Sequence, residues 1–188
     1  MKSIKSIGLM LVAALAFNFS FAQTMMKEKT VEVGGAAMYP SKNIVENAVN
    51  SKDHTTLVAA VKAAGLVETL MSAGSFTVFA PTNAAFGMLP VGTVESLVKP
   101  ENKAKLTGIL TYHVVAGKLD ADALKSKIKE GNGTAELTTV AGGKLLIMKK
   151  GGKLILKDEN GGMATISISD VYQSNGVIHV IDNVVFPK

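Results

Sequence analysis

The sequence contains no cysteine, no tryptophan and no arginine among its 188 residues. Without cysteine, the chain has no disulfides, no thiolate metal ligands, no cysteine nucleophile and no N-terminal cysteine for a lipid anchor. Aromatic residues make up only 5%, and every basic residue apart from histidine is lysine. Because arginine favours bidentate contacts with phosphate or guanine and aromatic rings stack on bases, this composition argues against nucleic-acid binding.

The N-terminus, residues 1–22, has the layout of a signal peptide. Lys2 and Lys5 supply the positive start, residues 7–17 form an apolar run, and residues 20–22 place Ser and Ala at the cleavage positions. The run is shorter than the roughly 20 residues of a membrane-spanning helix. We therefore expect a cleaved signal and an exported chain, secreted or periplasmic, with no membrane span; an uncleaved anchor is the alternative. Loss of the two lysines leaves 18 basic and 15 acidic residues, an ordinary net charge of +3.

The stretch after the signal divides into a leader and a helical region. Residues 23–40 show no sustained period and are expected to be a flexible leader, with the option of a short edge strand at 30–33. The folded domain is expected to cover 41–187. Apolar residues at helical spacing predict short helices between 41 and 72, one at 94–98, one that Pro100 opens, and one at 121–129 capped by Asp120.

The segment from Phe76 to Pro90 is the pivot between strands and helices. Its first residues, 76–79, are aromatic and β-branched, which predicts a short buried strand. Pro81 ends that strand because it has no N–H for the ladder. Thr82 or Asn83 can then cap a helix that carries Phe86 on its buried face.

The C-terminal part, from residue 133 on, changes to a period of two. Gly-Gly pairs separate short apolar runs, which indicates a meander of hairpins. The pair Asn175-Gly176 predicts a type I′ turn, and 177–181, apolar except for His179, predicts an interior strand. Residues 112–115 predict another short strand. Helices followed by antiparallel strands indicate an α+β domain.

Three segments carry a family resemblance. Residues 76–90 resemble the first signature of fasciclin-type (FAS1) domains, 176–187 resemble the second, and 112–117 resemble the Tyr-His segment between them. The resemblance covers 41–187 and implies N-terminal helices packed against a wedge of two mostly antiparallel β-sheets, in an extracellular adhesion and binding module. One departure is Asn83, where the family often has Asp. The motif residues implied to be structural are Phe79, Pro81, Thr82, Asn83, Phe86, His179 and Asp182.

No residue set in the sequence has the spacing of a catalytic or metal site. His54, His113 and His179 have no neighbouring ligand at zinc spacing, so neither a metal nor another cofactor is expected. No Ser lies in a G-x-S-x-G elbow. Buried histidines bonded to backbone carbonyls are the favoured interpretation, and a hydrolase using His113 or His179 is a remote alternative. Asp182 is expected to cap the turn before Val184.

The Tyr112-His113 pair has two interpretations. In animal members of the family, this segment with flanking apolar residues is associated with receptor adhesion, which implies partner-binding roles for Tyr112 and His113 with Leu110 and Val114. The alternative is that a short strand buries these side chains in the core.

The sequence thus favours a secreted, non-enzymatic adhesion module that binds an extracellular matrix, a polysaccharide or a surface protein. A carrier of an apolar small molecule is the alternative, motivated by nine methionines, which line adaptable apolar sites. The lysine-rich segment 118–129 contains interleaved acidic residues and is expected to be an ordinary solvated face. Asn132 begins a formal N-glycosylation sequon, which matters only in a host that glycosylates exported proteins.

Overall fold

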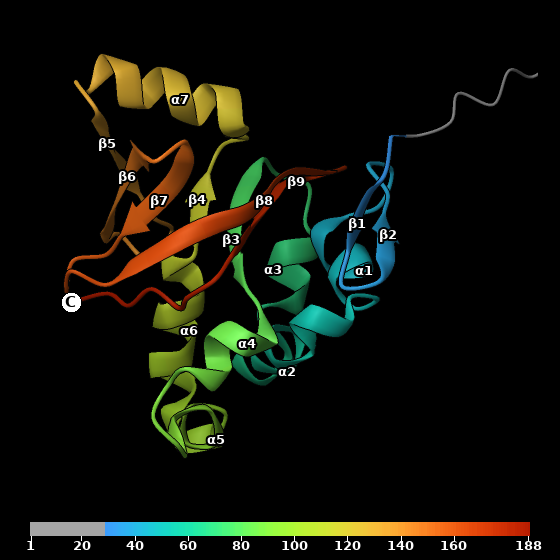
Figure 1. Ribbon diagram of the computed structural model, residues 1–188. Helices are drawn as coiled ribbons and strands as arrows, with labels where there is room; N and C mark the ends of the chain where they lie inside the picture. The colour runs from blue at the N-terminus through green and yellow to red at the C-terminus, as the bar shows by residue number, and fades with distance from the viewer. Residues whose placement is uncertain (1–28) are drawn as a thin grey trace, which may run out of the picture.

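The computed structural model describes residues 29–188, so the expected signal peptide lies outside the described residues. Its centre is a seven-stranded sheet in the order β4-β3-β9-β8-β7-β6-β5, and a separate hairpin pairs β1 with β2 (Figure 1). The strands are β1 (Val31–Val33), β2 (Ala36–Met38), β3 (Phe76–Pro81), β4 (Val114–Ala116), β5 (Thr134–Thr138), β6 (Lys144–Lys150), β7 (Lys153–Lys157), β8 (Met163–Gln173) and β9 (Gly176–Ile181).

The strands of the two signature segments lie side by side. β3 pairs with β9 in parallel, with Phe79 opposite His179 and Ala80 opposite Val180, whereas the other neighbouring strands of the sheet are antiparallel. Every residue of β9 is buried, as expected for an interior strand. The predicted meander from residue 133 onward is confirmed as β5 to β9.

A bend in β8 shapes the sheet. The first part of this strand pairs with β7, and most of its length pairs with β9 through a register that shifts twice between Ile166 and Val171. Asp170 lies at this irregularity with a φ of 61°, a left-handed conformation that non-glycine residues rarely adopt. At the far edges, a single bridge between Val115 and Thr139 brings the two ends of the sheet together. The two expected sheets are therefore halves of one barrel-like sheet joined along β8.

The helices divide the interior into two cores. Helices α1 to α6 pack on one core, which contains Ile44 and Ile178, and α7 closes a second core inside the barrel, which contains Leu124 and Ile147 (Figure 1). The helical elements are α1 (Ile44–Ala48), η1 (Lys52–His54), α2 (Thr55–Ala64), α3 (Val67–Met71), α4 (Asn83–Gly87), α5 (Thr93–Leu97), η2 (Pro100–Asn102), α6 (Lys103–Tyr112) and α7 (Ala121–Glu130). In the part of the chain that the structure describes, no helix combines the length and apolar character that crossing a membrane requires.

Local hydrogen bonds explain where these helices begin and end. The side chain of Thr82 accepts from the N–H of Ala85 at the start of α4, and Asp120 caps α7 in the same way. The start of α1 has a capping box in which Asn43 and Glu46 bond each other's backbone N–H groups. The N-cap of α1 is thus Asn43.

The structure corrects three sequence expectations. Residues 31–38 of the expected leader form the β1–β2 hairpin, whose Val33 and Met38 are buried in the core. The predicted strand at 112–115 is wrong at its start, because α6 continues to Tyr112 and β4 begins at Val114. The turn before β9 is made by Ser174 and Asn175, neither with positive φ, so it is not the predicted type I′ turn.

Candidate functional site: an apolar pocket and the surface around the barrel

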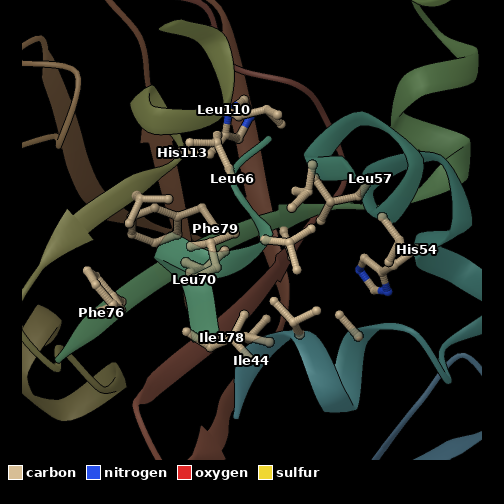
Figure 2. A pocket seen from close by; sticks show the side chains of 18 of the residues that line it. Ile44, His54, Leu57, Leu66, Leu70, Phe76, Phe79, Leu110, His113 and Ile178 are labelled. Carbon is tan, nitrogen blue, oxygen red and sulfur yellow. The ribbon is translucent and has the colours of Figure 1, made fainter. Parts of the chain in front are cut away.

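An apolar pocket lies between the first three helices and the sheet. Its volume is about 90 Å³, and its walls come from α1, α2, α3, β3, α6 and β9 (Figure 2). The lining side chains are almost all aliphatic or aromatic and include Ile44, Leu57, Leu70, Phe76, Leu110 and Ile178. Lys62 of α2 and Thr69 of α3 also line it and are exposed, so the pocket reaches the surface near these two helices.

His54 supplies an unusual polar group to this wall. It is 3% exposed, and its Nδ1 lies 2.9 Å from the hydroxyl of Ser51, which is also buried. Its Nε2 is buried without a hydrogen-bond partner among the described residues. Burial lowers the pKa of His54, and the nearby carbonyl of Ala80 and the charge of Asp53 oppose that shift only in part. The ring is therefore neutral at neutral pH.

His113 lies in the wall of the same pocket, but both ring nitrogens are occupied. Nδ1 lies 2.8 Å from the carbonyl of Ile109, and Nε2 accepts the N–H of Val185 at 3.2 Å. Burial lowers the pKa of His113 to about 4, and the carbonyl of Ile109 and the charge of Asp158 oppose this only partly. This ring joins α6 to the C-terminal segment.

His179 has the same kind of environment on the other side of β3. Its Nε2 lies 2.8 Å from the carbonyl of Leu119, its Nδ1 accepts the N–H of Asp170, and its ring stacks on Phe79. Burial lowers the pKa of His179. The sequence expectation of core histidines bonded to backbone groups agrees with both sites, and no Ser hydroxyl bonds His113 or His179 in the described chain.

The predicted partner-binding residues are all buried. Leu110 is 5% exposed, Tyr112 0%, His113 3% and Val114 7%. Leu110, His113 and Val114 line the pocket, whereas Tyr112 points into the barrel core and donates its hydroxyl to the carbonyl of Lys144. Burial raises the pKa of Tyr112 to about 12. This burial supports the alternative of a core role, and a partner-binding role for the segment stays a prediction.

The signature residues tie the helices to the sheet. Pro81 ends β3, and Phe86 packs half-buried against the helical core. The side chain of Asn83 accepts the N–H of Thr56 at the start of α2 and donates to the carbonyl of Lys52. An Asn therefore uses both its acceptor and its donor here, where an Asp offers acceptors alone.

Asp182 has a different partner from the one expected. Its side chain accepts the N–H of Thr165 in β8, and the turn before Val184 is capped by Asn183 instead. The expectation for Asp182 was wrong because the edge of β8 passes beside it, a tertiary contact that local sequence does not reveal.

Sequence reasoning missed a buried amide cluster at the junction of α1, α3 and the turn before β9. Asn175 accepts the N–H of Ile44 at 3.0 Å and donates to the carbonyls of Leu70 and Ser72 at 2.8 and 3.1 Å. Asn47, fully buried, bonds the backbone of Tyr39 and the side chain of Gln173. The sequence offered one signal for this cluster, namely that Asn47 and Asn175 stand close to apolar residues.

The surface beside β7 and β8 is hollowed and polar. The hollow has a volume of about 480 Å³ and is lined by Lys125, Lys153, Ser167, Ser169 and Asp170 among others. Asp170 is already engaged, since its carboxylate accepts the N–H of Ala121 at the start of α7. In the described chain, no group of three or more His, Cys, Asp or Glu side chains is arranged to hold a metal ion.

Comparison with known proteins places this geometry in a family. The model of the Fasciclin domain matches residues 52–187, which is most of the chain. The chain belongs to the fasciclin domain family. A search of solved structures finds a FAS1 domain pair from the insect cell adhesion molecule fasciclin I with a TM-score of 0.68 and 18% identity, over 78% of this chain and 51% of that chain. That likeness shows the FAS1 fold.

Similar fasciclin-family sequences occur in bacteria and animals. Protein sll1483 of Synechocystis sp. is 48% identical over 168 residues, covering 89% of this chain and 86% of that protein. Immunogenic protein MPB70 of Mycobacterium bovis is 36% identical over 145 residues, and the match covers 74% of this chain and 66% of that protein. Transforming growth factor-beta-induced protein ig-h3 of Sus scrofa is 35% identical over 70% of this chain, but only 17% of that protein is matched.

Proposed function

We propose that this fasciclin domain is an exported, non-enzymatic interaction module that binds an acidic extracellular polymer, a polysaccharide or an acidic surface protein, through the β6–β7 side of the barrel. The family includes domains of a cell adhesion molecule, and export follows from the signal peptide expected over 1–22. The observation that carries the choice of surface is the unpaired charge of the β6–β7 hairpin.

The β6–β7 hairpin concentrates free cations. Lys149, Lys150 and Lys153 are all exposed, and none forms an ion pair within residues 29–188. The two ion pairs of the described chain use Lys125 and Lys144 instead. Lys153 also lines the polar hollow. The hydroxyls of Ser167 and Ser169 there donate to the Val180 carbonyl and to Asp170, and their oxygens can still accept a hydrogen bond. Lysines attract carboxylate or sulfate groups, and hydroxyls suit the polar edges of sugars.

The hydrogen bonds of the three histidine rings support a non-enzymatic function. His113 and His179 already bond backbone groups through both nitrogens. The Ser51–His54 pair has no carboxylate bonded to its ring in the described chain. A nucleophile–base pair needs a third group that orients the base, so this pair fits a structural role better than hydrolysis.

The test is binding of the mature chain to immobilised acidic polysaccharide and to neutral dextran, with a salt titration. We expect micromolar binding to the acidic polymer alone, weakening as salt screens the charges. A variant with Lys149, Lys150 and Lys153 all changed to Ser should bind at least about 10-fold more weakly, because exposed lysines supply the attraction.

A charge-matched control separates a site from general attraction. Lys99, Lys103 and Lys105 are also exposed but lie around η2 and α6, away from the hairpin. Changing these three to Ser removes the same charge and should weaken binding by less than about 2-fold. Equal losses in both triple variants, or no binding of the parent at micromolar concentration, would refute the proposed surface.

A second candidate function, carriage of an apolar small molecule, is favoured by the pocket under α1 to α3. A well-formed apolar pocket with a few polar groups is the default binding-site hypothesis for a small molecule. Native mass spectrometry of protein purified from its own host should show an added mass. Bare protein mass in repeated preparations would count against this candidate.

A further inference from the structure

We propose that the apolar pocket binds a small neutral molecule, or the end of a longer chain, that carries one hydrogen-bond acceptor such as a ketone, ester or alcohol oxygen, and that the Nε2–H of His54 donates to it. This inference rests on the second candidate function and names the class of ligand. Three observations support it.

The first observation is an unused donor. The hydroxyl of Ser51 has the Nδ1 of His54 as its hydrogen-bond partner, 2.9 Å away. If the hydroxyl donates to Nδ1, the ring proton of the neutral tautomer is on Nε2. That nitrogen is buried and has no partner with hydrogen-bond geometry in the described chain; the carbonyl of Ala80 lies near the ring but does not meet that geometry. A buried polar group without a partner costs about 1–3 kcal/mol. A ligand acceptor removes this cost.

The second observation is the character of the cavity. Apart from Ser51 and the two histidines, few polar side chains line it, and His113 has no free nitrogen. Apolar cavities stay dry, and water needs at least two polar partners to be held in one. An apolar molecule with a single acceptor therefore matches the walls better than a cluster of water molecules. The neutral ring of His54 also selects a neutral group over a carboxylate.

The third observation is size. The cavity of about 90 Å³ is smaller than the ~150 Å³ apolar cavity that accepts benzene. A handful of non-hydrogen atoms fits without rearrangement, and a longer chain can leave through the opening near Lys62 and Thr69. His54, in η1, lines this cavity together with Leu57 of α2 and Ile44 of α1 (Figure 2).

The experiment compares two probes of the same shape. Acetone has a carbonyl oxygen where 2-methylpropane has a methyl group, so the pair isolates the acceptor, and both molecules are smaller than benzene. NMR titration of the labelled full-length chain should show both probes shifting pocket-lining methyl signals, and the ketone alone shifting the ring ¹⁵N signals of His54. In His54→Phe the ratio of ketone to alkane affinity should fall about 3- to 10-fold, the usual range for one hydrogen bond.

A second pair of variants keeps the test valid if His54→Phe does not fold. Ala48 of α1 lines the pocket, and Ala59 of α2 is exposed and lies outside it. Ala48→Leu should fill the pocket and abolish binding of both probes, and Ala59→Leu should bind as the parent does. Binding of both probes with an unchanged ratio in His54→Phe, or with unmoved His54 signals, would overturn the role of His54 and leave the carrier function standing. No shift of pocket signals with either probe would overturn both.

Discussion

Asn175 should be one of the most sensitive positions in the chain. Its amide accepts the N–H of Ile44, which opens α1, and donates to the carbonyls of Leu70 and Ser72 at the end of α3. It is 6% exposed. One side chain in the turn before β9 thus holds two helices from another part of the sequence.

The cost of removing this amide follows from its three hydrogen bonds. Asn175→Ala eliminates all three, and each contributes about 1 kcal/mol net. The free energy of unfolding should therefore fall by about 3 kcal/mol, measured by urea denaturation at neutral pH. Asn175→Asp keeps the acceptor for Ile44 but turns a carboxylate toward two carbonyl oxygens, so it should be at least as damaging and should recover stability as the carboxyl is protonated at lower pH.

The control variant changes an asparagine whose side chain makes one exposed hydrogen bond. Asn50 donates only to the carbonyl of Glu46 on the surface of α1, and Asn50→Ala should cost less than about 1 kcal/mol. If Asn175→Ala also costs less than about 1 kcal/mol, the reasoning that this amide braces the helices is refuted.

Three further outcomes are expected. The pKa of His113 is about 4 in the folded chain and 6.5 in the unfolded chain, so the unfolded chain binds more protons between these pH values. This ring should therefore lower the free energy of unfolding by about 3 kcal/mol from pH 6.5 to pH 4. Urea denaturation of His113→Gln at several pH values should show a smaller fall. Asn83→Ala should cost about 1 kcal/mol of unfolding free energy and Asn83→Asp less than that. The carboxylate loses the donation to the carbonyl of Lys52, which is exposed and can bond water, but it keeps the bond to the first turn of α2 and favours the helix dipole. An equal loss in both variants would contradict this. Gly176→Ala places a Cβ against the backbone oxygen of Phe76 and should lower the free energy of unfolding by more than about 2 kcal/mol in thermal unfolding. Gly87→Ala meets nothing within 4 Å and should change it by under about 1 kcal/mol.

The parts of the fold that the sequence predicted are those set by local rules. The Thr82 cap of α4, the Asp120 cap of α7 and the Gly-Gly turns of the meander depend on neighbours within a few residues. The parallel pairing of β3 with β9 was not predicted, because it joins the two signature segments from distant parts of the sequence and no local rule specifies it.

The failures come from contacts between distant segments. The β1–β2 hairpin has a Gly-Gly turn at residues 34 and 35, both with positive φ, but its strands are only three residues long. It is stabilised because Val33 and Met38 pack in the helical core, which the local sequence does not reveal. Asn175-Gly176 reads as a type I′ turn, but bonds to α1 and α3 fix the Asn175 side chain and override the local preference. The candidate ligand group at His54 depends on a cavity that no sequence pattern reveals.

The three histidines show why function must be sought outside the signature motifs. Protonation of His113 would turn Nε2 into a donor that faces the N–H of Val185, and protonation of His179 would do the same opposite Asp170. These rings can therefore act as neutral links between segments but cannot exchange protons without breaking the links. Tyr112 and Phe79 are likewise fully buried in the barrel core, although both signature segments also expose residues such as Met88 and Asp182. Groups that remain free to meet another molecule include the exposed hairpin lysines and, in the pocket, the Nε2 of His54. Binding should accordingly tolerate conservative changes in the signature motifs that preserve the fold, and should respond to changes at these two places.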